Sequence, residues 1–195
     1  MLGKLELLES LAGQKRGILT SPQERQAIQA AIARLEDRNP IADPLTAKEL
    51  EGDWRLLFTT SKDLLGIDRL PLVSLGEIYQ CVRFPSQRIY NFAEVNGPLL
   101  SGLVAVSARF EPVSRKRVNV AFERGVIGLQ GLLDYQNPSQ FIDRLSQGSK
   151  LPWFRGIDFD INRQNQQGWL EVTYLDDDMR IGRGNEGSLF VLRKC

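Results

Sequence analysis

The chain has 195 residues, of which 42% are hydrophobic and 25% charged, the balance of a globular protein rather than a disordered or fibrous one. Its formal net charge of +1 excludes a whole-molecule field that would steer the protein towards nucleic acid or an acidic membrane face. The absence of histidine removes the commonest general base and zinc ligand, together with every Ser–His or Cys–His nucleophile pair. This absence weighs heavily against a hydrolase, and we assign no catalytic residue and no metal site.

Cysteine usage and apolar segments indicate the compartment. Cys81 and Cys195 lie far apart in the chain, which favours a reducing compartment over a disulfide framework. The longest apolar stretch, residues 97–108, is shorter than the roughly 18 to 20 residues that cross a bilayer. Glu6 and Glu9 interrupt the apolar N-terminus, unlike a secretory signal. We expect a soluble protein without a cleaved secretory signal.

The N-terminal quarter has the periodicity of two short helices. Leucines recur at helical spacing in the first, at Leu2, Leu5, Leu8 and Leu11. Ser21-Pro22-Gln23-Glu24 is a capping box with proline at the first helical position, and it predicts the start of the second. The apolar stripe of that helix needs a partner, so we expect residues 1–49 to form a helical segment packed on the following domain.

From residue 50 to the C-terminus the hydrophobic period is two, which predicts strands. We expect strands over residues 54–59, 77–84, 88–95, 103–110, 116–123, 169–175, 179–183 and 188–193. Residues 137–156, rich in proline and glycine, are expected to be an irregular excursion with one helical turn. About eight strands, mostly joined to their sequence neighbours, predict a mainly β protein: an antiparallel barrel or sandwich over residues 50–195.

Gly182-Arg183-Gly184-Asn185-Glu186-Gly187 has the G-x-G-x-x-G spacing of a dinucleotide-binding loop. That motif needs a following helix, a returning parallel strand and an acidic residue about 20 positions later. Only eight residues follow Gly187, and they are β-prone. We interpret the glycines as the turn between the last two strands.

Asp176-Asp177-Asp178 lacks the ligand spacing and the glycine of a calcium loop. We interpret the run as a hairpin turn, because aspartate caps its own backbone there. An ion pair of one of these carboxylates with Arg180 or Arg183 is the alternative.

Two sequence features carry a resemblance. Gly52-Asp53-Trp54, at the head of the first strand, is similar to the G-x-W motif of lipocalins. The segment 52–61, together with 168–184 and 187–192, closely resembles the plastid lipid-associated protein family, also called fibrillins, of plastids and cyanobacteria. The resemblance implies a lipocalin-like barrel that binds a hydrophobic small molecule, without agreed catalytic residues. It also implies peripheral association with thylakoids or plastoglobules and a role in photoprotection. The absence of an evident transit peptide favours a cyanobacterial member or the mature form of a plastid protein.

The resemblance and the alternation give a candidate site. In lipocalins the tryptophan closes the barrel under an arginine of the last strand, so Trp54 and Arg193 are the expected closing pair. The side chains expected to face the lumen and bind a ligand are Trp54, Leu56, Phe58, Val104, Val106, Phe110, Val118, Val120, Phe122 and Tyr174. A packed core is the alternative for each of them. Arg109 and Asn119 are candidates to orient a head group, or else solvated outward residues.

Three connecting stretches are more apolar than surface loops require. Their expected membrane or lid residues are Leu64, Leu65, Ile67, Leu72, Ile127, Leu129, Trp153 and Phe154. Three roles are compatible with them: a lid over the barrel mouth, docking on the N-terminal helices, or shallow insertion into lipid.

Together with the resemblance, these observations favour a non-enzymatic carrier or structural protein for a carotenoid, quinone, fatty acid or other lipid, with no cofactor beyond such a ligand. We expect it to be cytoplasmic and peripheral to a thylakoid membrane, or in the stroma or plastoglobule if it comes from a plastid. One alternative is a ligand-free structural or adaptor protein that docks partner proteins through its apolar loops. Another is a chromophore-attachment enzyme on a related barrel, assisted by Cys81 or an acidic residue. The absence of histidine weighs against the enzyme.

Overall fold

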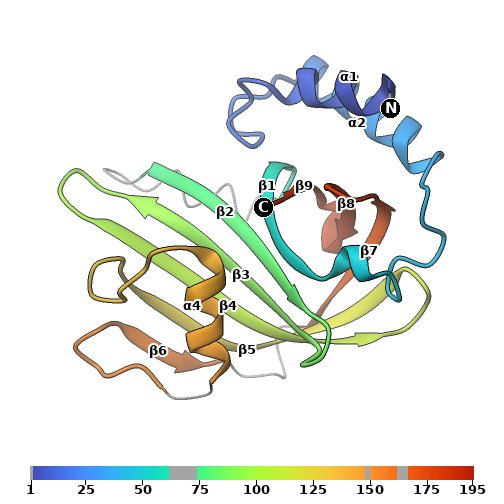
Figure 1. Ribbon diagram of the computed structural model, residues 1–195. Helices are drawn as coiled ribbons and strands as arrows, with labels where there is room; N and C mark the ends of the chain where they lie inside the picture. Colours follow the sequence, from blue (N-terminus) through green and yellow to red (C-terminus); the bar gives the residue numbers. More distant parts are fainter. Residues whose placement is uncertain (1, 62–73, 148–149, 162–166) are drawn as a thin grey trace.

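The change from helical to strand periodicity near residue 50 marks the change from helices to sheet in the computed structural model (Figure 1). The structure describes residues 2–61, 74–147, 150–161 and 167–195. The helical elements are α1 (Leu2–Leu11), α2 (Pro22–Glu36), η1 (Lys48–Leu50), α4 (Pro138–Ser146) and η3 (Asn185–Gly187). The strands are β1 (Gly52–Thr59), β2 (Ser74–Arg83), β3 (Arg88–Asn96), β4 (Ser101–Pro112), β5 (Arg117–Leu129), β6 (Ile157–Asp160), β7 (Gln167–Leu175), β8 (Met179–Gly184) and β9 (Leu189–Lys194).

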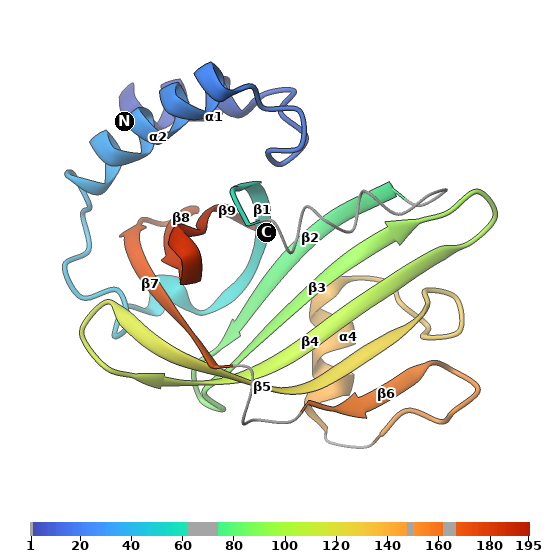
Figure 2. The same cartoon turned by 180° about the vertical axis from the view of Figure 1, so that it is seen from behind.

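Eight of these strands close into an antiparallel barrel, as the sequence predicts. The order is β4-β3-β2-β1-β9-β8-β7-β5, and the pairing of β4 with β5 completes the ring. β5 is long enough to pair twice along one edge, with β7 over residues 117–121 and with β6 over residues 124–127. β2 to β5 therefore extend beyond the short strands of the opposite wall (Figures 1 and 2).

The excursion at residues 137–156 contains more structure than the sequence indicates. Residues 138–146 form the helix α4, capped by Asn137, whose side-chain oxygen accepts from the backbone N–H of Gln140 at 3.0 Å. The expectation of one helical turn is wrong because α4 continues as an amphipathic helix whose apolar side packs on the outer face of β2 to β5. β6 lies outside the strands that the sequence predicts, because it has only four residues.

Three apolar clusters divide the core. The first lies on the inner side of the barrel, the lumen, with residues from β1 to β5, β7 and β9. The second lies between α1 and α2 and the outer face of β1, β7, β8 and β9. The third lies between α4 and the outer face of β2 to β5. Parts of the barrel wall are thus buried on two sides, and the two groups of helices cover different parts of it (Figure 2).

The capping box at α2 is confirmed. Ser21 Oγ accepts from the backbone N–H of Glu24 at 3.3 Å, and a Glu24 carboxylate oxygen accepts from the N–H of Ser21 at 2.8 Å. The expected apolar stripe of α2 is buried in the second cluster, at Ile28, Ala31, Ile32 and Leu35. The N-terminal helices therefore find their partner on the outside of the barrel.

The glycine-rich segment does form the last turn, but only in part. Gly187 adopts a φ of 70° next to Glu186 at 57°, within η3 between β8 and β9. Gly182 and Gly184 instead lie inside β8, where the turn interpretation is wrong. A Cβ at Gly184 would stand 3.2 Å from the ring of Phe190, so close packing rather than bending accounts for this glycine.

Candidate functional site

Trp54 occupies one end of the lumen and is completely buried. Its indole N–H donates to the carbonyl of Leu50 at 3.0 Å, which fixes the ring at the entry to β1. Two cations face the ring: Arg180 Cζ is 5.0 Å and Lys194 Nζ is 5.2 Å from its centroid. This end of the barrel is closed by tryptophan and cations, as cation–π attraction favours.

The expectation that Arg193 covers Trp54 is wrong. Alternation along β9 buries Leu192 in the lumen cluster and turns Arg193 outward, where its side chain is 52% exposed and lies 3.8 Å from Asp178. The arginine over the tryptophan is Arg180, which comes from β8 and pairs with Leu192 across the sheet. Sequence alternation alone does not reveal this, because it does not fix which face of β8 points inward.

Most of the residues expected in the lumen lie on its inner face. Trp54, Leu56, Phe110 and Val118 belong to the lumen cluster, and Val120 packs against it. Val104, Val106 and Phe122 share the inner face by register, opposite Ala93, Asn91 and Ala108. These three are half-buried, unlike Trp54, so the inner face of β3 to β5 becomes more exposed away from the closed end.

Phe58 and Tyr174 are corrections to the lumen set. The pairing register shifts between Leu56 and Phe58 in β1 and between Val172 and Tyr174 in β7. Each shift reverses the alternation, because one extra residue moves the following side chains to the other face. Both rings therefore join the second cluster, under α1 and α2.

The polar side chains of the lumen are not those expected from sequence. Arg109 and Asn119 are exposed, and Arg109 pairs with Glu123 at 3.3 Å. Arg180 instead donates to the Gln80 side-chain oxygen, and Gln80 donates to the Asn91 oxygen at 2.8 Å. Gln80 alternates in register with Ile78 and Val82, and that position was the sequence signal for an inward polar group.

The other end of the long strands is apolar and exposed. Ile127, Leu129, Trp153 and Phe154 come together there in a groove of about 410 Å³ that also includes Val95, Val104, Leu132 and Ile157. Trp153 is 90% exposed, and Leu99, in the β3–β4 turn, is 93% exposed. The β3–β4 turn and the loops at either side of α4 lie at the left of Figure 1. We call this region the apolar end; the expected loop residues Leu64, Leu65, Ile67 and Leu72 lie outside the described residues.

Cys81, the residue expected to assist in the enzyme alternative, lies under α4 and is completely buried. Burial and the nearby Asp53 carboxylate raise the pKa of its thiol. A thiol in this setting is protonated at neutral pH and is a poor nucleophile. The described residues bring together no group of three or more metal-ligating acidic or cysteine side chains.

The fold and the site define a small closed β-barrel protein with an apolar interior, cations at one end and an exposed apolar groove at the other. The PAP_fibrillin family model matches residues 1–193, and the chain belongs to this family. Among the described residues no helix has the length and apolarity needed to span a bilayer.

Curated relatives agree with the family. The chain is 36% identical to the potato (Solanum tuberosum) protein "Light-induced protein, chloroplastic", over 98% of the chain and 66% of the relative. It is 34% identical, again over 98% of the chain, to Arabidopsis thaliana "Probable plastid-lipid-associated protein 2, chloroplastic" and to cucumber (Cucumis sativus) "Chromoplast-specific carotenoid-associated protein, chromoplastic", covering 70% and 67% of them. The chain thus spans about two thirds of the length of these relatives. No solved structure matches it.

Proposed function

We propose that the protein is a non-enzymatic binding protein that holds a lipophilic small molecule and attaches peripherally to a photosynthetic membrane or lipid droplet. The observation that carries the proposal is the continuity of the lumen with the apolar end. Val104 and Ile127, paired across β4 and β5, line the groove that Trp153 and Phe154 border. One apolar surface thus leads from the barrel interior to the outside.

The free energy gained by burying the exposed apolar side chains of this surface in lipid is sufficient for reversible attachment to a membrane. Burying one large apolar side chain contributes about 1.5–3 kcal/mol, so transfer of Leu99, Trp153, Phe154 and Ile157 into lipid offsets the cost of association. Arg155 is exposed beside them and favours an anionic lipid surface. Lys150 lies nearby but already pairs with Asp160 at 2.7 Å.

The names of the relatives support the class of ligand. The cucumber protein is described as carotenoid-associated and the Arabidopsis protein as plastid-lipid-associated. We extend to this chain a ligand of the same broad class: a carotenoid, quinone, fatty acid or other lipid.

Vesicle flotation tests the attachment. Wild-type protein is expected to float with protein-free vesicles of thylakoid lipids, and a Trp153→Ser/Phe154→Ser variant is expected to lose about tenfold or more in partitioning. Val113→Ser is the matched control, because Val113 is an exposed apolar residue in the β4–β5 turn at the opposite end of β4. Wild-type protein that stays unbound, or equal losses in both variants, would contradict the attachment.

Mass spectrometry of protein extracted from its own membranes tests the ligand. A lipid, pigment or quinone retained above background is expected. Protein that carries none, and that binds a partner protein through the apolar end, would support the adaptor function instead.

A further inference from the structure

Arg180 is almost completely buried, with 2% of its surface exposed, and unlike the buried carboxylate of Asp158, which pairs with Arg124, it has no oppositely charged partner among the described residues. It lies over Trp54 inside the barrel and donates one hydrogen bond, from Nη2 to Gln80 Oε1. A guanidinium carries five N–H donors in a planar fork. Most of the donor capacity of Arg180 is therefore not used by the described side chains.

Other arginines of this chain show what a paired guanidinium looks like. Arg124 contacts Asp158 through Nε at 2.8 Å and Nη2 at 2.6 Å, and Arg183 contacts Glu36 in the same two-pronged way at 2.9 and 2.6 Å. Among the described residues, no carboxylate lies within ion-pair distance of Arg180, although it is more buried than either. Burial lowers the pKa of Arg180 to about 9, so the group still carries its charge at neutral pH.

The surroundings of Arg180 combine positive charge with apolar surface. Lys194 places a second cation at the same end, with Nζ 2.7 Å from the carbonyl of Glu49. From Arg180 the hydrogen bonds through Gln80 reach Asn91, which is half-buried opposite Val106. The next inner residue along β4, Val104, pairs with Ile127, and both line the groove at the apolar end.

Burying a cation without a counter-charge costs desolvation free energy. A carboxylate whose two oxygens accept hydrogen bonds from the guanidinium offsets that cost. We propose that Arg180 binds the carboxylate of a long-chain amphiphile, whose apolar chain follows the inner face of β3 to β5 towards the apolar end. Gln80 orients the guanidinium from the neighbouring wall. The inference rests on the proposed function and adds the chemistry of the head group.

Binding of three oleyl probes tests this assignment: oleate, methyl oleate and oleyl alcohol, each measured by displacement of a fluorescent lipid from the full-length protein. Wild-type protein is expected to prefer oleate by about tenfold or more. Arg180→Met is expected to lose this preference and to bind oleate no more tightly than methyl oleate. Arg117→Met is the matched control, because Arg117 also stacks on a tryptophan, Trp169 at 4.3 Å, but is exposed and paired with Glu171.

Each result decides the matter. Equal affinity of wild type for the three probes, or a preference that survives in Arg180→Met, overturns the role of Arg180 and leaves the proposed function standing. Failure of all three probes to bind overturns both. If Arg180→Met does not fold, carboxyl-labelled oleate bound to wild type provides the second measurement. The pKa of the bound oleate carboxyl, measured by NMR titration, is expected to lie below the pKa of a carboxyl without a bound cation. A carboxyl pKa at or above that of the cation-free carboxyl overturns the assignment of Arg180 as the carboxylate-binding residue.

Discussion

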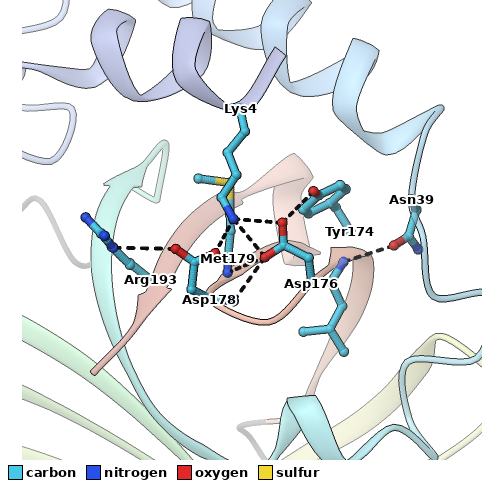
Figure 3. A network of polar contacts seen from close by, with 8 residues as sticks. Lys4, Asn39, Tyr174, Asp176, Asp178, Met179 and Arg193 are labelled. Atoms are coloured by element: carbon cyan, nitrogen blue, oxygen red, sulfur yellow. Dashed lines mark hydrogen bonds and ion pairs between the residues drawn. The ribbon is translucent and has the colours of Figure 1, made fainter. Parts of the chain in front are cut away.

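Lys4, on α1, and Asp176, in the turn between β7 and β8, lie 172 positions apart in the sequence, and Lys4 Nζ is 2.8 Å from Asp176 Oδ2 (Figure 3). The same carboxylate accepts from the Tyr174 hydroxyl at 2.7 Å and from the backbone N–H groups of Asp178 and Met179. Asp176 therefore shapes the hairpin turn and also holds the N-terminal helix on the barrel. The turn interpretation of the aspartate run is confirmed, and the cation that pairs with Asp176 is Lys4.

Replacing Asp176 by asparagine is expected to lower the free energy of unfolding by about 1–3 kcal/mol, because several donors lose a charged acceptor in a partly buried place. Urea denaturation followed by circular dichroism measures the change. Asp177→Asn is the matched control: Asp177 is the exposed neighbour in the same run and is expected to stay within about 0.5 kcal/mol of wild type. Similar losses in both variants would contradict this role of Asp176.

Asp176 also predicts a pH dependence of stability. Burial alone would raise the pKa of Asp176, but hydrogen bonds from Lys4, Tyr174 and two backbone amides lower it from 3.8 to about 2. A carboxyl with a lowered pKa in the folded state stabilises it above the unfolded pKa, and the contribution disappears as pH falls through the folded value. Wild-type protein is thus expected to lose stability between about pH 4 and pH 2 more steeply than Asp176→Asn. Parallel curves of stability against pH for the two proteins would contradict the role of Asp176 in this pH dependence.

Gly17 is expected to be required where the chain passes from α1 to α2. Its φ is +107°, and a Cβ there would lie 2.4 Å from the carbonyl oxygen of Thr59, next to the Phe58 ring. Gly13, at φ +77°, is the matched control, because a Cβ there meets no described atom within 4 Å. Thermal unfolding is expected to show a loss of about 1 kcal/mol for Gly13→Ala and about 1–3 kcal/mol more for Gly17→Ala. Equal losses would mean that the helices do not contact β1 at this point.

The two cysteines are expected to differ in reactivity. Cys81 is completely buried with a raised pKa, whereas Cys195 is exposed at the C-terminus. In the native protein a thiol reagent is therefore expected to modify Cys195 and to reach Cys81 only after unfolding. A Cys195→Ser variant isolates the second reaction. Rapid modification of that variant in its native state would revive the chromophore-attachment function.

Much of this protein is determined by local sequence. The capping box at Ser21 starts α2, period-two alternation gives the barrel strands, and the β-prone residues after Gly187 form a strand and not the helix of a dinucleotide-binding unit. The family resemblance is confirmed over almost the whole chain. These features depend on residues close together in sequence, so they can be recognised without knowing what packs against them.

Only the tertiary structure decided which face each side chain occupies. The register shifts in β1 and β7 moved Phe58 and Tyr174 out of the lumen, and β8 rather than β9 placed the arginine over Trp54. The gathering of Ile127, Leu129, Trp153 and Phe154 at one end likewise depends on how β5 and β6 pair. An alternating pattern fixes which residues share a face, but the packing of the whole barrel determines whether that face points inward.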